Sequence, residues 1–116
     1  MDKSPQAVFD KVVAHLRQQG EQSLGPDGAC MYRGTEGRMC AVGCLIPDSE
    51  YSEGMEGRPV DALKLFRDWS GDVISLLGRL QNAHDRCLGV LPEARWEDRF
   101  RSIAADFGLV YTAPAP

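Results

Sequence analysis

The sequence contains no apolar run that approaches the roughly 18 residues needed to cross a bilayer. Its first residues lack the apolar stretch of a secretory signal peptide, and neither half of the chain has an excess of basic residues. We therefore expect a cytoplasmic protein with no membrane and no direct nucleic-acid partner. The 116 residues, 43% hydrophobic and 26% charged, suffice for one domain with its own core and exclude wholesale disorder.

Acidic residues outnumber basic ones by 17 to 13, which gives a net charge of −4. One stretch carries four acids with no base between them: Asp48, Glu50, Glu53 and Glu56. A solvated loop is the common explanation of such a stretch. The alternative is a surface complementary to a basic partner, because opposite charge speeds the association of two proteins.

The spacing of apolar residues predicts four helices. The first runs from Pro5 to Gln19, because proline suits the first helical position and Gly20 is a typical left-handed cap. The others are expected at 60–69, from a cap at Ser70 or Asp72 to about Leu88, and from Pro92 to Phe107. Gly78 interrupts the third helix, and we interpret it as a point of close helix contact.

Between the first two helices, two short runs flank a polar turn rich in glycine. Residues 29–33 and 38–42 around the turn 34–37 are typical of a β-hairpin. The predicted fold class is mainly α (α+β), a four-helix bundle-like single domain over 1–111 with a small β-hairpin inserted after the first helix. The Pro-rich residues 112–116 are expected to be a disordered tail. A homodimer remains open, if the helix around Trp96 exposes a second apolar edge.

The four cysteines, without a signal peptide, are expected to be thiols: Cys30, Cys40, Cys44 and Cys87. Together with His84 they provide the ligand types of a structural zinc. Their spacings, however, contain no C-x2-C pair. We predict no metal and no cofactor, and keep a zinc-stapled module as an alternative.

A cysteine nucleophile is the other chemical alternative. Cys40 or Cys44 could open a helix whose dipole favours the thiolate, with His84 as the base. Asp85 is not expected to orient the imidazole of His84, since adjacent helical residues point about 100° apart. The orienting carboxylate would then have to come from elsewhere in the chain.

The segment from Cys30 to Asp48 has the pattern CxYRGxxGxxCAVGCLIPD, and Tyr51 and residues 55–57 follow it. This pattern, with residues 80–85 and 96–109, resembles a group of small uncharacterised proteins of bacteriophages and prophages. The resemblance implies an origin in a mobile element and supplies no catalytic residues.

Proteins of this kind often work by binding. We therefore expect a non-enzymatic accessory protein of the host cytoplasm that binds and inhibits a host protein or ribonucleoprotein complex, for example a CRISPR effector or a transcription factor. Tyrosine and arginine dominate interface energetics, and the acidic stretch suits a basic partner. The predicted contact residues are Tyr32, Arg33, Glu36, Asp48, Glu50, Glu53 and Glu56.

Overall fold

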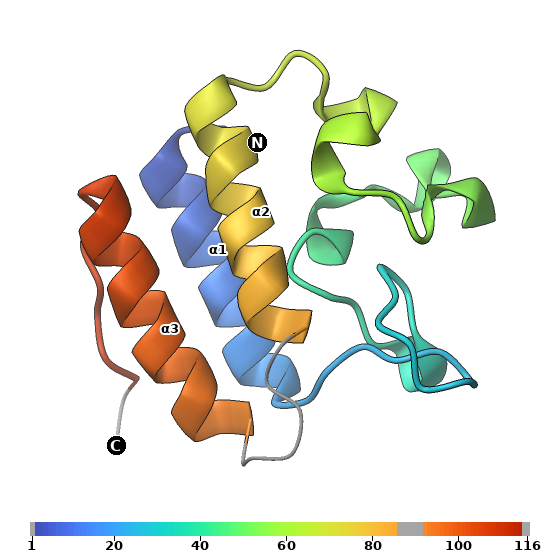
Figure 1. Cartoon of the computed structure of the whole chain (residues 1–116), viewed down its shortest axis with the longest axis horizontal. Helices are drawn as coiled ribbons and strands as arrows, with labels where there is room; N and C mark the ends of the chain where they lie inside the picture. The colour runs from blue at the N-terminus through green and yellow to red at the C-terminus, as the bar shows by residue number, and fades with distance from the viewer. Residues whose placement is uncertain (1, 86–91, 115–116) are drawn as a thin grey trace.

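The computed structural model of the chain describes residues 2–85 and 92–114, without the side chains of 92–95. Three α-helices lie on one side of the molecule: α1 (Pro5–Gln19), α2 (Gly71–Asp85) and α3 (Pro92–Phe107). The segment between α1 and α2 covers the other side, as Figure 1 shows. The mainly helical fold class is therefore correct, while the four-helix bundle with a hairpin is not what the structure describes.

Helix α1 has the bounds that its sequence predicts. Pro5 begins the helix, and Gly20 ends it at φ 73°, donating its N–H to the carbonyl of Leu16. Ser4 occupies the N-cap position, but its side chain makes no capping hydrogen bond. The apolar residues of α1 recur at helical spacing and are buried: Val8, Phe9, Val12, Val13 and Leu16.

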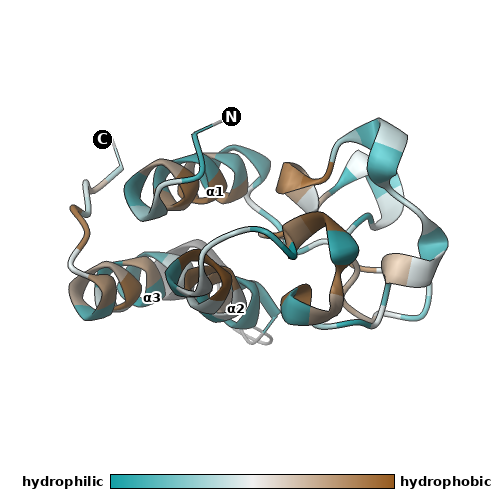
Figure 2. Cartoon of the chain, turned by 90° about the horizontal axis from the view of Figure 1, so that it is seen from above, coloured by the Kyte–Doolittle hydropathy of each residue, from teal (hydrophilic) through white to brown (hydrophobic). Residues whose placement is uncertain are grey.

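The three helices contact one another and enclose the main core. Figure 2 shows their apolar faces turned toward each other and their polar faces turned outward. The bulkiest buried side chains come from α3 and from the segment that precedes α2: Trp96, Phe100 and Phe66. The stripe of α3 thus faces the core, where burial of each large side chain contributes about 1.5–3 kcal/mol.

The segment before α2 is built from six short 3-10 turns. They are η1 (Thr35–Gly37), η2 (Gly43–Leu45), η3 (Asp48–Glu50), η4 (Glu53–Met55), η5 (Val60–Ala62) and η6 (Lys64–Phe66). Only isolated bridges join its described residues, Leu24 to Cys30 and Arg33 to Met39. Of these turns, η2, η5 and η6 bury apolar side chains, and η2 contacts α1 while η5 contacts α2.

The predicted hairpin of 29–33 with 38–42 is reduced to one bridge, Arg33 to Met39, because residues 29–31 pair with the preceding loop instead. Met31 donates its N–H to Ser23, and Gly25 donates its N–H to Ala29. On the other arm, Gly43 lies directly on the backbone of Tyr32, where a Cβ would come within 2.0 Å of the Tyr32 carbonyl oxygen. The chain turns there into η2, so the ladder stops after one bridge.

The predicted helix over 60–69 is also replaced, by η5 and η6. Val60, Leu63 and Phe66 are the buried residues of this segment, at a spacing of three. That spacing matches the three residues per turn of a 3-10 helix better than the 3.6 of an α-helix. Leu63 itself is extended (φ −87°, ψ 126°), which separates the two turns.

The ends predicted for the last two helices have different outcomes. Helix α3 has its predicted bounds, and Gly108 follows it at φ 67°. Two features named from the sequence lie outside the described residues: the predicted end of α2 at about Leu88, and the thiol of Cys87. In the predicted tail, Thr112 accepts a hydrogen bond from Arg17 (2.9 Å), and residues 115–116 lie outside the described residues.

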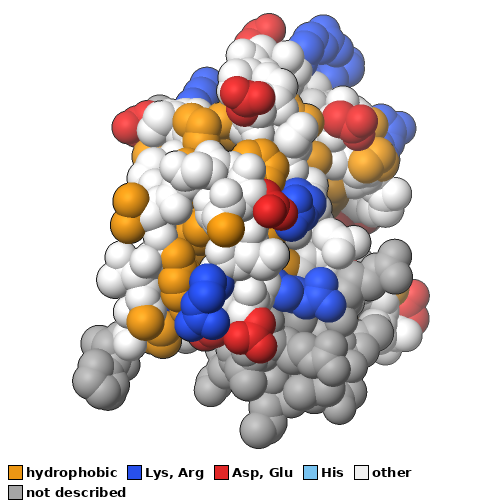
Figure 3. All heavy atoms as spheres, turned by 60° about the vertical axis from the view of Figure 1, so that its left-hand side comes forward, with side chains coloured by type: hydrophobic (Ala, Val, Ile, Leu, Met, Phe, Trp, Pro, Cys, Tyr) orange, Lys and Arg blue, Asp and Glu red, His pale blue; other side chains and the backbone are white. Residues whose placement is uncertain are grey.

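The side of the molecule on which α3 lies carries interspersed acidic, basic and apolar side chains, as Figure 3 shows. Val110, at 70% exposure, is the large hydrophobic residue most open to solvent among those the structure describes. No helix within residues 2–85 and 92–114 combines the length and hydropathy that a bilayer-crossing segment requires.

Candidate functional site

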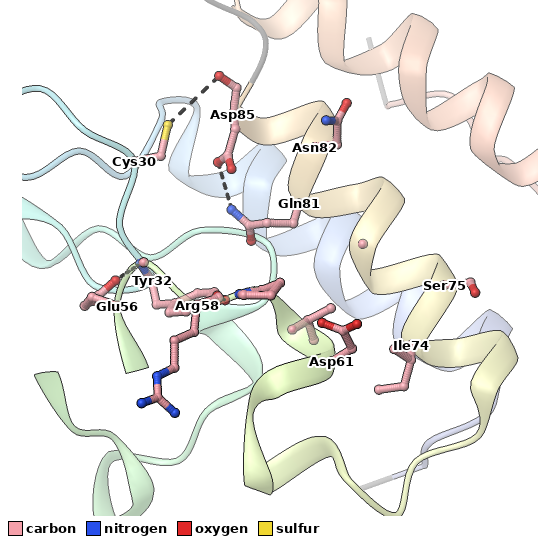
Figure 4. Close-up of a pocket in the computed structure, with 14 residues that line it drawn as sticks. Cys30, Tyr32, Glu56, Arg58, Asp61, Ile74, Ser75, Gln81, Asn82 and Asp85 are labelled. Atoms are coloured by element: carbon pink, nitrogen blue, oxygen red, sulfur yellow. Dashed lines mark hydrogen bonds between the residues drawn. The ribbon is translucent and has the colours of Figure 1, made fainter. Parts of the chain in front are cut away.

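A groove runs between α2 and the segment 56–61, with a cavity volume of about 660 Å³. We call it the α2 groove; Figure 4 shows it from the side. Cys30 and Tyr32 contribute to its wall beside the 56–61 segment. Helix α2 supplies the other wall: Ile74, Ser75, Gly78, Gln81, Asn82 and Asp85.

His84, next to the groove, is completely buried and both of its ring nitrogens are bonded. The backbone N–H of Ser23 donates to Nε2 (3.0 Å), so Nε2 carries no proton. The ring proton therefore lies on Nδ1 and is donated to Oδ1 of Asp85 (2.7 Å). The ring also stacks on Trp96, with centroids 5.9 Å apart. These contacts fix His84 as a neutral imidazole that joins α2 to the loop after α1.

Asp85 does orient His84, contrary to the sequence-based expectation. Its carboxylate is held by Gln81, whose Nε2 donates to the same Oδ1 (2.8 Å). The side-chain oxygen of Gln81, Oε1, in turn accepts a hydrogen bond from the N–H of Val42 (3.1 Å). The angle of about 100° between neighbouring helical positions describes the directions of the Cα–Cβ bonds, and rotation about the side-chain bonds still brings Oδ1 of Asp85 to 2.7 Å from the His84 ring.

The structure brings Cys30, rather than Cys40 or Cys44, to this pair. One ligand atom each from Cys30, His84 and Asp85 lies within 4.8 Å of the other two. These are zinc ligand types. A metal at His84 would have to replace the proton shared with Asp85 or displace the N–H of Ser23. The hydrogen bonds therefore fit a structural imidazole better than a metal ligand.

The described thiols are poor nucleophiles. Burial raises the pKa of the Cys30 thiol to about 11, and the nearby Asp85 adds to the shift. Burial likewise raises the pKa of Cys44 to about 11 and the pKa of the fully buried Cys40 further still. Cys40 accepts the N–H of Gly43, and Cys44 donates to the carbonyl of Ala41. These sulfurs pack and bond within the loop they belong to.

Alkylation tests this description. At pH 8, iodoacetamide should modify Cys30 and Cys44 about 100-fold more slowly in the native protein than in urea, because a pKa raised by two units lowers the thiolate fraction about 100-fold. Peptide mapping by mass spectrometry separates the sites. Faster alkylation of Cys44 in the native protein than in the unfolded protein would instead indicate an activated thiol and favour the cysteine-enzyme alternative.

Glu56, a predicted contact residue, serves the fold. Its Oε1 accepts the N–H of Tyr32 (2.7 Å), and its Oε2 accepts the N–H of Arg33 (3.1 Å) and the hydroxyl of Tyr51 (2.7 Å). Burial and this carboxylate raise the pKa of Tyr51 to about 12. Tyr32 is 6% exposed, and its hydroxyl donates to the carbonyl of Arg58. The clamp formed by Glu56 therefore ties η4 to residues 32 and 33.

Arg33 and Asp48 also interact within the chain. The guanidinium of Arg33 lies over the ring of Tyr51 (4.6 Å), donates to the carbonyl of Ile46 (2.8 Å), and pairs with Asp48 at 2.7 Å. The Asp48 side chain is nevertheless 95% exposed. Three further predicted contact residues are exposed: Glu36, which pairs with Arg38, and Glu50 and Glu53. The predicted set is thus divided between internal contacts and the surface.

Two groove residues were missed as site candidates. Asp61 is exposed on the wall opposite α2, and nothing in its sequence context distinguishes it. Gly78 was noticed, but its interpretation as a close helix contact is wrong. A Cβ there would meet nothing within 4 Å, although glycine inside a helix costs about 1 kcal/mol relative to alanine. A usable signal was the sequence pattern that begins at Cys30 and the stretches that accompany it, because several of their residues line the groove: Cys30, Tyr32, Glu56, Gly57, Gln81, Asn82 and Asp85.

Comparison with known proteins leaves the geometry as the basis for a functional proposal. No protein-family model matches the chain, and neither a curated protein nor a solved structure is significantly similar to it.

Proposed function

We propose that this chain is a non-enzymatic protein of phage type that binds and inhibits a host protein or ribonucleoprotein complex. The observation that carries the proposal is the bonding of His84, whose two ring nitrogens are both engaged inside the fold. The raised pKa values of the described thiols support it. The groups best suited to catalysis, the His84 imidazole and the described thiols, thus stabilise the fold. The function then depends on binding through the protein surface.

The exposed acids of the segment between α1 and α2 supply the charge for that contact. Glu50 and Glu53 are exposed, and the exposed Asp48 lies nearby in η3. A complex that binds nucleic acid presents a basic channel. Charge complementarity to such a channel raises the association rate by a factor on the order of 10–10³. An acidic protein of this size could occupy the channel and exclude the nucleic acid.

Charge reversal tests the proposal. Glu50→Lys with Glu53→Lys should lower the association rate for the complex captured from a bacterial host lysate about tenfold at low salt, and should flatten the dependence of that rate on salt. Surface plasmon resonance measures both. The matched control is Asp10→Lys with Asp98→Lys, which makes the same charge change on α1 and α3.

The wild-type protein should also reduce the nucleic-acid binding of the captured complex. The proposal fails if the reversed variant associates as fast as the control, or if the captured complex keeps its full activity when saturated with the wild-type protein. Glu56 and Asp48 are left intact in this design, because changing either would disturb the contacts of Arg33 or Tyr32.

A further inference from the structure

We propose that the α2 groove receives an extended segment of the partner protein that places one lysine or arginine side chain beside Asp61 and another beside Asp85. This inference rests on the proposed binding function and names the chemistry of the partner. The volume of the groove is about 660 Å³. Ligand pockets have volumes of roughly 300–1,000 Å³, so the groove has room for a short stretch of chain.

The first support is the charge of the groove. Among the described residues, its lining contains three acids, Glu56, Asp61 and Asp85, against one base, Arg58. No hydrogen bond or ion pair from the described residues ends on Asp61. The side chain of Asp85 is 34% exposed. Among the described residues, both hydrogen bonds to its carboxylate end on Oδ1 and none ends on Oδ2. Figure 4 shows the guanidinium of Arg58 pointing away from α2, so the groove favours a cation.

The second support is Gly78. Two other glycines are required by the fold itself, because a Cβ on Gly34 or Gly43 would come within 2.5 Å or 2.0 Å of a backbone oxygen. Gly78 has no such neighbour, and its helical position favours a residue with a side chain. A partner backbone that lies close against α2 would explain the glycine, since any side chain there would fill the groove.

The third support is the apolar surface along the groove. Ile74 is partly buried, and Val60 and Tyr32 are buried beneath the opposite wall. Lysine and arginine carry long methylene stems that pack on apolar surface while their charged ends remain near carboxylates. The groove offers both kinds of contact along one path.

The test uses the full chain labelled with ¹⁵N and a seven-residue probe peptide in which lysine and arginine alternate with alanine. Titration should shift the amide signals of residues 57, 58, 60, 61 and 74–82. The same peptide with glutamate in place of the basic residues should leave them unchanged. Asp61→Asn should weaken binding of the basic peptide at least threefold, because it removes one of the two carboxylates.

Gly78→Ala should weaken binding at least tenfold while raising the midpoint of urea unfolding. Gly71→Ala is its matched control: it adds the same methyl group to α2, also with no atom within 4 Å, but outside the groove lining. This control should leave the Kd unchanged. A loss of affinity in a variant that is more stable separates an occupied groove from a damaged fold.

The proposal is overturned if Gly78→Ala binds the basic peptide as tightly as the wild type, if the shifts lie outside the groove, or if free arginine binds as tightly as the peptide. The last result would define a site for small cations. If the host complex is still captured by the Gly78→Ala and Asp61→Asn variants, the groove is not its docking site, while the binding function stands. If the wild type captures no complex, the binding function fails and the peptide titration still decides the groove.

Discussion

Replacing His84 by phenylalanine is expected to lower the free energy of unfolding by about 2–4 kcal/mol, although the side chain is completely buried and the new ring is apolar. The reason is that two polar groups lose their partner at once. The N–H of Ser23 no longer has an acceptor, and Asp85 loses the donor that approaches it at 2.7 Å. Urea unfolding of the two proteins under the same conditions measures the difference.

His84→Ala separates the polar contribution from packing. It removes the same hydrogen bonds and also the stacking on Trp96, and leaves a cavity, so we expect a larger loss of about 3–5 kcal/mol. His15→Phe is a comparison at a partly buried site, where the ring makes one hydrogen bond, to the carbonyl of Met39. It should cost about 1 kcal/mol. A cost below about 1 kcal/mol for His84→Phe would contradict the structural role assigned to His84.

The long helices were predictable because each carries its own signals. In α1, a proline at the start, a glycine at the end and an apolar stripe between them agree with one another, and the bounds follow. In α3, Trp96, Phe100 and Ile103 repeat at helical spacing and are buried together. Such agreement depends only on residues within one turn of each other, so no tertiary information is needed.

The segment between α1 and α2 was predicted less well because its structure depends on partners far away in the chain. Residues 29–31 pair with 23–25, a choice between two neighbours that local propensity does not settle. Residues 60–66 form two 3-10 turns on either side of the extended Leu63, and the buried residues Val60, Leu63 and Phe66 follow a spacing of three. The conformation of a short element depends on the tertiary surface against which it packs, and local sequence does not identify that surface.

The candidate site shows the same division. The residue types of the chemistry were recognised, but their grouping was not, since Cys30 meets His84 and Asp85 across more than fifty positions. The conclusion that Asp85 could not orient His84 considered only the directions in which neighbouring helical side chains start, whereas side-chain rotation brings their polar atoms to 2.7 Å. The acidic stretch was recognised as well, yet its four members have different roles, because only tertiary contacts distinguish Glu56 from Glu53.

Glu56→Gln is expected to lower the free energy of unfolding by about 2–4 kcal/mol, since hydrogen bonds to a charged acceptor are worth about 1.5–3 kcal/mol and here both oxygens accept from the backbone. An amide has one oxygen and one NH₂ group. Whichever way the glutamine turns, its NH₂ group opposes the N–H of Tyr32 or Arg33. Urea unfolding gives the total cost, and hydrogen exchange at those two amides localises it.

Glu53→Gln is the matched control, because it makes the same chemical change three residues away on an exposed side chain. It should alter stability by no more than about 0.5 kcal/mol. Similar costs at the two positions would mean that the clamp formed by Glu56 does not hold η4 against residues 32 and 33. A large difference, with faster exchange only at Tyr32 and Arg33, would establish that Glu56 holds the loop while Glu53, in the same acidic stretch, contributes little to its stability.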